Sequence, residues 1–369
     1  MILTSLEMID FRNYEQEKID FADQKNFLFG NNAQGKSNLL EAIYLSCLSK
    51  SFRTSHEKEA IAFSKQNFIL KAEFKFDNGN KQKVTLLCSN NKGKEISVNR
   101  KRISRISEFI GNFPVVLSSP EEYNLTTGPP PERRKFIDIL LSQVSKKYIH
   151  FLIEYFRILK QKNAILQKWK QTGKQNQIEL EPWNERLVEI GSKIIDFRNK
   201  FSGQLSINIK DIYSKLVKNN EQLDFTYHPN VEFNSSEEIE SCFENKLKQL
   251  FYKEVQRGTS LAGPHRDDFI FKINGHDLKK FGSRGQHKTV LISLAAAEYE
   301  LIKKLTEETP ILLIDDLYSE LDVNRENNIL DLLEGFGQVF ITSTEIHNKD
   351  SKEEKSKHFF VKSGTVQPA

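Results

Sequence analysis

Alternating hydrophobic and polar residues in the first hundred positions predict β-strands. The alternation over Ile2–Ile9 predicts one strand, and the apolar run Phe27–Phe29 predicts the end of a second strand joined to it by a turn. Further along, Phe68–Phe74, Gln82–Leu87 and Glu95–Asn99 alternate in the same way, and Gly-containing turn sequences separate them. Because no helical pattern lies between these three segments, we expect an antiparallel meander rather than strand–helix–strand units.

The middle of the chain follows a helical period instead. Apolar residues recur at spacings of three and four in the segments Tyr148–Leu159 and Ile190–Phe201, which gives each helix one apolar face. Polar linkers interrupt the helices at 171–177 and 234–238. The pattern is too short for a long coiled coil, and it predicts an antiparallel helical lobe.

Strand patterns return after this lobe, together with one long apolar helix at Val290–Leu305. Short apolar runs predict a strand before the lobe at Val115–Leu117, and strands after it at Phe269–Ile273, Ile311–Ile314, Val339–Thr342 and Phe359–Val361. We therefore expect an α/β chain in three stretches. Residues 1–117 and 256–369 are predicted to form the two parts of one lobe, and residues 118–255 the inserted helical lobe.

Composition narrows the class of protein only slightly. The 369 residues carry a net charge of +4, which permits a nucleic-acid partner without requiring one. The cysteines are odd in number and widely spaced, so they predict small buried residues rather than disulfides or a zinc site. No apolar run approaches the ~20 residues of a membrane helix, and no signal-peptide pattern opens the sequence. We expect a cytoplasmic protein without a membrane partner.

The strongest local motif is a phosphate loop, G-x-x-x-x-G-K-S. It comprises Gly30, Asn31, Asn32, Ala33, Gln34, Gly35, Lys36 and Ser37. Its glycines allow backbone N–H groups to surround phosphate oxygens at the start of a helix. In such loops the lysine reaches the outer phosphates, and the serine hydroxyl is a ligand of Mg²⁺. A plain glycine-rich turn is the alternative, and the flanking strand and helix patterns favour nucleotide binding.

Two further segments could complete the site. The run Ile311–Ile314 delivers Asp315 to the end of a buried strand, where ligands of parallel sheets bind, and we expect this strand beside the strand of the phosphate loop. An ordinary acidic strand end is the alternative for Asp315 and Asp316. Ser283-Arg284-Gly285-Gln286 resembles an anion site at a helix start, although many helix caps look the same.

The order of these motifs resembles that of the ABC-type ATPases of chromosome maintenance and repair, and more narrowly the RecF family of bacterial repair proteins. The local matches are Phe11–Tyr14, Ser119–Glu121 with Arg133-Arg134, Gly263–Asp268, Gly285-Gln286, and Asp315-Asp316 with Ser319–Asp322. The resemblance covers nearly the whole chain. It implies an ABC-type P-loop ATPase head of mixed sheet plus antiparallel meander, with an inserted α-helical lobe.

The resemblance also implies roles for individual residues. The phosphate loop would bind ATP, Ser37 and Asp315 would hold Mg²⁺, and Lys36, Asp315 and Asp316 would be catalytic. Asp316 stands where many ABC ATPases have a longer glutamate, so slow hydrolysis is expected. Ser283, Gly285 and Gln286 would form the signature, which contacts the ATP held by a second subunit. Ser319 and Asp322 would belong to a loop at which the two subunits meet, and Arg12 would lie near the nucleotide.

Two expected family features are not evident in the sequence. Thr342-Ser343-Thr344 stand where ABC ATPases usually have a switch histidine, and no glutamine loop is evident. His265 lies in a Gly-Pro turn and is interpreted as structural.

The implied function is an ATP-dependent clamp used as a switch, a weak ATPase rather than a metabolic enzyme. ATP would join two copies of the chain on gapped, single- or double-stranded DNA, with repair partners of the RecO/RecR type. Arg100, Lys101 and Arg102 are the candidate DNA contacts, although a solvated basic sheet edge explains them equally well.

Two other classes remain as alternatives. The ATPase subunit of a membrane transporter would share the loop and signature, but the length of the helical insertion argues against it. A nuclease with an ABC ATPase head would need an extra domain with clustered carboxylates, and the tail after Thr344 is too short for one.

Overall fold

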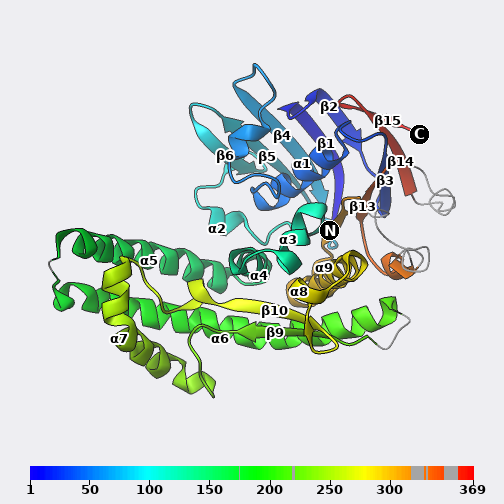
Figure 1. The fold of residues 1–369 in the computed structure, drawn as a ribbon. Helices are drawn as coiled ribbons and strands as arrows, with labels where there is room; N and C mark the ends of the chain where they lie inside the picture. The colour runs from blue at the N-terminus through cyan, green and yellow to red at the C-terminus, as the bar shows by residue number, and fades with distance from the viewer. Residues whose placement is uncertain (174, 218–220, 317–327, 330, 345–355) are drawn as a thin grey trace. The chain divides into compact units, whose positions relative to one another are not determined.

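The computed structural model describes residues 1–173, 175–217, 221–316, 328–329, 331–344 and 356–369. The chain divides into two compact units (Figure 1). The first unit comprises 1–123, 215–219 and 283–369, and the second comprises 124–214 and 220–282. Residues 256–282 thus belong to the second unit, beyond the stretch 118–255 expected for the inserted lobe.

The first unit contains most of the strands. They are β1 (Ile2–Phe11), β2 (Tyr14–Asp20), β3 (Lys25–Phe29), β4 (Asn67–Lys75), β5 (Lys81–Ser89), β6 (Gly93–Val98), β7 (Lys101–Arg102), β8 (Val115–Ser118), β12 (Ile311–Ile314), β13 (Val339–Ser343), β14 (Ser356–Lys362) and β15 (Thr365–Pro368). Its helices are α1 (Lys36–Leu48), α2 (Ile106–Phe109) and α9 (Arg284–Thr306), with short 3₁₀ turns η1 (Glu57–Ala60) and η2 (Pro120–Glu122).

The second unit contains most of the helices. They are α3 (Tyr123–Thr127), α4 (Pro130–Val144), α5 (Lys146–Thr172), α6 (Gln177–Leu216), α7 (Ile239–Arg257) and α8 (Leu278–Phe281), and α3 and α6 each cross a unit boundary at one end. The remaining elements are β9 (Leu223–His228), β10 (Asp268–Ile273), β11 (His276–Asp277), η3 (Ser236–Glu238) and η4 (Pro264–Arg266).

One sheet of the first unit is the predicted meander, extended at both ends. Its order is β2-β1-β4-β5-β6-β7, and every pair is antiparallel. The prediction that Phe27–Phe29 ends the strand paired with Ile2–Ile9 is wrong, because β2 takes that place and β3 belongs to a different sheet. The buried run Lys25–Leu28 in β3 is typical of a parallel strand that is covered on both faces.

The second sheet of this unit has the order β15-β14-β3-β13-β12-β8, with five parallel strands and β15 antiparallel at one edge. The prediction that the Asp315 strand lies beside the phosphate-loop strand is therefore wrong. Strand β13 lies between β12 and β3, and Ile341 pairs with both Ile314 and Phe27. Both neighbours of β3 come from the last 31 positions of the chain, 339–369.

Helix α1 packs against strands of both sheets. Eleven of its residues are buried, so it has no polar face to turn to solvent. Helix α9 contacts β8 and is also largely buried. Helix α1 begins in the phosphate loop, and α9 begins in the Ser283–Gln286 motif. The buried helices therefore fix the positions of both motifs.

The second unit is not purely helical. Its three-stranded sheet has the order β11-β10-β9, so the prediction of a helical lobe is wrong at Leu223–His228, which forms a strand. The alternating sequence Leu-Asp-Phe-Thr-Tyr-His is a strand pattern, and it becomes β9 by pairing with β10.

A buried arginine joins the helices of the second unit to its Gly263–Asp268 turn. Arg198 is 1% exposed. Its guanidinium donates to Asp138 Oδ1 and Asp267 Oδ2, each at 2.8 Å. It also donates to the Tyr148 hydroxyl at 3.1 Å and to the Pro264 carbonyl at 2.6 Å. Because two carboxylates compensate this charge, its burial is tolerated, and removing Arg198 leaves the buried Asp267 without this cation.

His265 in the same turn has no free ring nitrogen. The Tyr155 hydroxyl lies 2.7 Å from Nδ1, and the Ser260 carbonyl lies 3.2 Å from Nε2. Burial lowers the pKa of His265 to about 3, so the ring is neutral at physiological pH. These contacts fit the structural role expected from the sequence.

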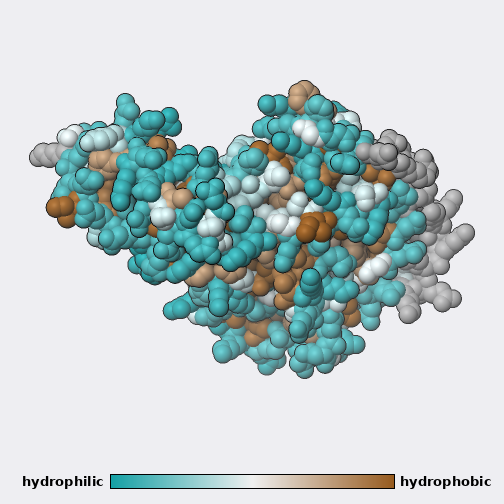
Figure 2. Space-filling model, turned by 90° about the horizontal axis from the view of Figure 1, so that it is seen from below, coloured by the Kyte–Doolittle hydropathy of each residue, from teal (hydrophilic) through white to brown (hydrophobic). Residues whose placement is uncertain are grey.

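Among the described residues, no helix combines the length and apolar character needed to cross a bilayer. Figure 2 shows a surface that is hydrophilic over most of the face in view.

The buried arginine gives a stability prediction. Arg198→Met should lower the free energy of unfolding by about 3–5 kcal/mol, because Asp267 would remain buried without its cation. The measurement is urea unfolding followed by circular dichroism. Lys200→Met is the matched control on the same helix, since the Lys200–Asp196 pair has a lysine that is 68% exposed. It should cost under about 1 kcal/mol, and equal losses in the two variants would contradict the assignment.

Candidate nucleotide-binding site

The phosphate loop joins the end of β3 to the start of α1, as the sequence predicts. Gly30 and Gly35 have φ angles of 148° and 122°, which side chains rarely adopt. A Cβ atom on Gly30 would lie 2.3 Å from the Val361 carbonyl oxygen of β14. A Cβ on Gly35 would lie 2.9 Å from the Tyr14 hydroxyl. Both glycines are therefore required by close backbone packing as well as by conformation.

Two neighbouring turns hold the loop from outside. From the β1–β2 turn, the Asn13 amide donates to the Gln34 carbonyl and the Tyr14 hydroxyl to the Gly35 carbonyl, each at 2.9 Å. From the β14–β15 turn, the Gly364 N–H donates to the Gln34 carbonyl at 3.1 Å. Because these bonds occupy carbonyl groups, the loop shape is fixed in advance, which favours anion binding by its N–H groups. They also give the Phe11–Tyr14 motif a structural purpose.

Lys36 lies at the inner wall of the loop. Its ammonium donates to the Gly30 carbonyl at 2.6 Å and to the Asn31 carbonyl at 2.9 Å. Burial lowers the pKa of Lys36, and the nearby carboxylates Asp315 and Asp316 act in the opposite direction. A phosphate group in the loop would therefore meet a cation that is already held in place.

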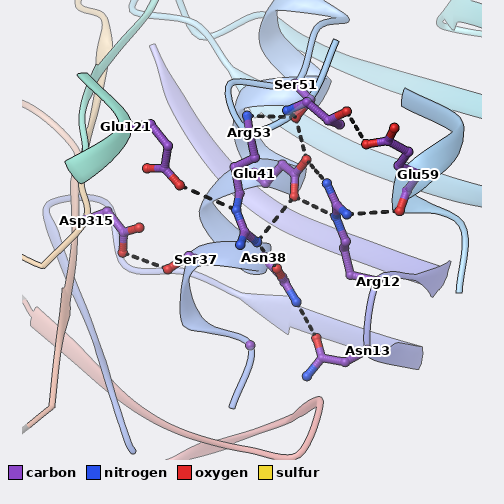
Figure 3. Close-up of polar contacts among 12 residues, drawn as sticks. Arg12, Asn13, Ser37, Asn38, Glu41, Ser51, Arg53, Glu59, Glu121 and Asp315 are labelled. Carbon is purple, nitrogen blue, oxygen red and sulfur yellow. Dashed lines mark hydrogen bonds and ion pairs between the residues drawn. The ribbon is translucent and has the colours of Figure 1, made fainter. Parts of the chain in front are cut away.

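The acidic strand end lies directly beside the loop. The Ser37 hydroxyl donates to Asp315 Oδ1 at 3.1 Å, although the two residues are 278 positions apart (Figure 3). The Thr342 hydroxyl also donates to Asp315 Oδ1, at 2.6 Å. A hydroxyl and a carboxylate are oxygen donors of the type that Mg²⁺ prefers, so Ser37 and Asp315 together fit a magnesium site.

Asp316 follows at the same sheet edge with an unusual backbone. Its φ angle is 57°, its N–H donates to Thr342 Oγ1 at 2.8 Å, and its carbonyl accepts from Lys288 Nζ at 2.9 Å.

These elements enclose a cavity of about 430 Å³, within the range for small-molecule sites. Its lining comprises most of the phosphate loop with Asn38, together with Arg53, Pro120, Glu121, Asp315, Asp316 and Thr342–Thr344. The structure thus brings the loop and both aspartates into one site. Among the described residues, none of the three signature residues Ser283, Gly285 and Gln286 lines this cavity.

Arg53 and Glu121 are cavity residues to which the sequence analysis gave no role. Arg53 hydrogen-bonds to the Asn38 side chain, and its Nε lies 3.6 Å from Glu121 Oε1 (Figure 3). Arg53 lies in none of the motifs found in the sequence. Glu121 lies in the family match Ser119–Glu121, but that match implied no role for the glutamate.

Arg12 does not line the cavity. Its guanidinium makes a two-bond contact with the buried Glu41 carboxylate of α1, with Nε at 2.9 Å and Nη2 at 2.7 Å (Figure 3). It also donates to the Glu59 carbonyl at 2.9 Å. In this arrangement Arg12 anchors α1 to the β1–β2 turn, because it neutralises a carboxylate that is 0% exposed.

The signature residues begin α9 as predicted. The Ser283 side chain accepts from the Gln286 N–H at 3.2 Å, and the Gln286 side chain accepts from the Ser283 N–H at 2.9 Å. This reciprocal capping box fixes the helix start. Gly285 lies between the two residues of the capping box. Ser319 and Asp322 lie outside the described residues.

The candidate DNA contacts lie on one hairpin, β6–β7. Asn99 and Arg100 form its turn with φ angles of 49° and 68°. Arg100, Lys101 and Arg102 are exposed, and Arg102 pairs with Glu95 at 3.1 Å. Arg100 and Lys101 thus present their charges at a tip, whereas part of the Arg102 charge is compensated within the hairpin.

The sheet order, the loop at the end of β3 and the acidic end of β12 together define the head fold of the ABC-type ATPases. A head domain of an Smc protein bound to a part of ScpA has this fold, with a TM-score of 0.57 at 14% identity over 100% of this chain and 97% of that one. The family model described as "RecF/RecN/SMC N terminal domain" matches residues 2–367.

The relatives are more specific. The chain is 39% identical to the DNA replication and repair protein RecF of Alkaliphilus oremlandii, over 99% of this chain and 100% of that protein. It is 38% identical to the RecF of Staphylococcus carnosus, over 95% of each chain. A structure titled as the recombination mediator protein RecF with ATP, in the RecFOR pathway, has a TM-score of 0.91 at 33% identity, over 100% of this chain and 97% of that one. The chain belongs to the RecF family.

The close approach at Gly30 gives a prediction for the loop. Gly30→Ala should abolish tight nucleotide binding and cost about 1–3 kcal/mol of stability, because the new methyl group collides with the β14 backbone. Titration with a fluorescent ATP analogue measures the first effect and thermal unfolding the second. Gly79→Ala is the control, since Gly79 also has positive φ but nothing lies within 4 Å of its added Cβ. If both variants bound nucleotide equally well, the loop would not need this packing.

Proposed function

We propose that the chain is an ATP-dependent DNA-binding protein of recombinational repair and replication restart, in which ATP joins two copies on DNA. The single observation that carries this proposal is the joint site of Lys36, Ser37 and Asp315, in which a fixed cation and oxygen donors meet at a phosphate loop. Membership of the RecF family supports it. The solved structure of a relative, the recombination mediator protein RecF with ATP in the RecFOR pathway, supports it as well.

Each residue of the site has a distinct task. The loop N–H groups and Lys36 bind the phosphates of ATP, and Ser37 and Asp315 hold Mg²⁺, which neutralises phosphate charge when bound. Asp316 orients the water that attacks the outer phosphate. Because an aspartate side chain is one methylene shorter than glutamate, this positioning is poor and hydrolysis is slow. ATP then acts as a switch with a long lifetime.

Dimerisation follows from the incompleteness of one site. The capped start of α9 offers Ser283, Gly285 and Gln286 to the ATP of a second copy, as the family resemblance implies, because these residues do not line their own subunit's cavity. A ligand that bridges two subunits stabilises the dimer by mass action. Hydrolysis removes the bridging phosphate and releases the pair. DNA, gapped, single- or double-stranded, is held by the dimer, and partners of the RecO/RecR type act with it.

The dimerisation model gives a direct test. In the unaltered chain, Mg-ATP should raise the dimer fraction in sedimentation experiments, and gapped duplex DNA should raise it further. Lys36→Ala should reduce the affinity for ATP about 10–100-fold, since a hydrogen bond to a charged group is lost, and should prevent dimer formation at moderate ATP concentrations. Lys65→Ala, which removes an exposed lysine paired with Asp10, is the control. Dimerisation unchanged by Lys36→Ala would overturn the clamp model.

The hairpin tip gives a separate test of DNA contact. The double change Arg100→Ala with Lys101→Ala should weaken binding to all DNA sequences alike. It should also reduce the slope of log affinity against log salt concentration by about one for each lost phosphate contact. Fluorescence anisotropy with labelled duplex at several salt concentrations measures this slope. Lys81→Ala, at another hairpin end of the same sheet, is the control, and an unchanged slope would remove the hairpin from the DNA interface.

A further inference from the structure

We propose that Thr342 is the positioning residue that sets both acidic side chains of the site, Asp315 and Asp316, through a single hydroxyl group. This inference rests on the proposed function, because it concerns the magnesium and water sites of ATP hydrolysis. It assigns a task to a residue of Thr342-Ser343-Thr344, which stand where ABC ATPases usually have their switch histidine.

Thr342 is placed for this task by the sheet order. Strand β13 lies between the phosphate-loop strand β3 and the acidic strand β12, so its end stands between the two halves of the site. Thr342 is 1% exposed, and it lines the cavity together with its neighbours Ser343 and Thr344. Its hydroxyl group is held by bonds to Asp315 and Asp316.

The Thr342 hydroxyl donates one hydrogen bond and accepts another, and the two partners fix which is which. A hydroxyl has one hydrogen to donate and lone pairs to accept with. The hydrogen goes to Asp315 Oδ1 at 2.6 Å, and the oxygen accepts the Asp316 N–H at 2.8 Å. Because the N–H can only donate and an ionised carboxylate can only accept, both directions are fixed. Valine has the same shape and could do neither.

For Asp315, Thr342 is the anchor that does not depend on the loop. Oδ1 accepts from both Ser37 and Thr342. If Ser37 serves as a magnesium ligand through an oxygen lone pair, its hydrogen can still be donated to Asp315. The Thr342 bond is a second anchor of the same carboxylate oxygen, and it comes from β13 rather than from the loop. Hydrogen bonds of this kind orient metal-binding carboxylates and raise metal affinity.

For Asp316, Thr342 stabilises a backbone conformation that the residue would otherwise leave. The φ angle of 57° is unfavourable for a residue with a side chain. The N–H bond to Thr342 and the carbonyl bond from Lys288 hold the two sides of the residue. The direction of the Asp316 carboxylate follows from this backbone, so loss of the Thr342 bond would displace the group that orients the attacking water.

The test compares Thr342→Val with Thr342→Ser in the full-length chain. A fluorescent ATP analogue is titrated with EDTA present and again over a range of Mg²⁺ concentrations, and ATP hydrolysis is measured at saturating Mg²⁺. We expect Thr342→Val to bind the analogue normally in EDTA, because the loop is intact. Its requirement for Mg²⁺ should rise about 10–100-fold, and kcat should fall with little change in KM. Thr342→Ser, which keeps the hydroxyl, should stay within a few-fold of the unaltered chain.

The outcomes separate this inference from the proposed function. Ser46→Ala removes another buried hydroxyl, bonded to a carbonyl of α1, and should leave all values unchanged. If Thr342→Val does not fold, Thr342→Ala takes its place, with the same expectation. An unaltered chain that binds no ATP would overturn the proposed function and this inference with it. An unaltered chain that binds ATP, with equal magnesium requirement and kcat in the valine and serine variants, would overturn the inference alone.

Discussion

The parallel pairing of β3, β13 and β12 is the constraint on which the candidate site depends. All three strands end at the same sheet edge, so a loop near the start of the chain and a carboxylate near its end come within hydrogen-bonding distance. The apolar residues of these strands drive this arrangement, because they are buried on both faces of the sheet. The polar groups of the site contribute chemistry, while burial of the strands fixes their positions.

Local patterns in the sequence predicted the parts of the fold that depend on neighbouring residues. The meander, the phosphate loop with α1, and the long helix α9 each have a period or a motif of their own, and each forms as expected. The acidic end at Asp315 was also found, because four apolar residues precede it. Family resemblance supplied the ABC-type head fold, which no local pattern could give.

The failures share a physical cause, which is pairing between distant segments. Strand β9 was hidden inside a helical region, since its alternation is short and its partner β10 lies far downstream. The insertion of β13 between β3 and β12 could not be derived, because several parallel orders bury the same residues equally well. Arg53 follows α1 in the chain and lines the cavity, where it bonds to the Asn38 side chain, and its sequence neighbours contain no sign of this.

Strand β3 has a consequence for how the protein is made. It is synthesised within the first thirty residues, yet both of its neighbours, β13 and β14, come from the end of the chain. On the ribosome its backbone N–H and C=O groups therefore have no native partner strand until β13 and β14 have been synthesised. An unpaired apolar strand is a site for wrong pairing and aggregation, and contacts so distant in sequence form slowly. The meander can form earlier from local hairpins, so the sheet that carries the phosphate loop is expected to be the last part of the first unit to fold.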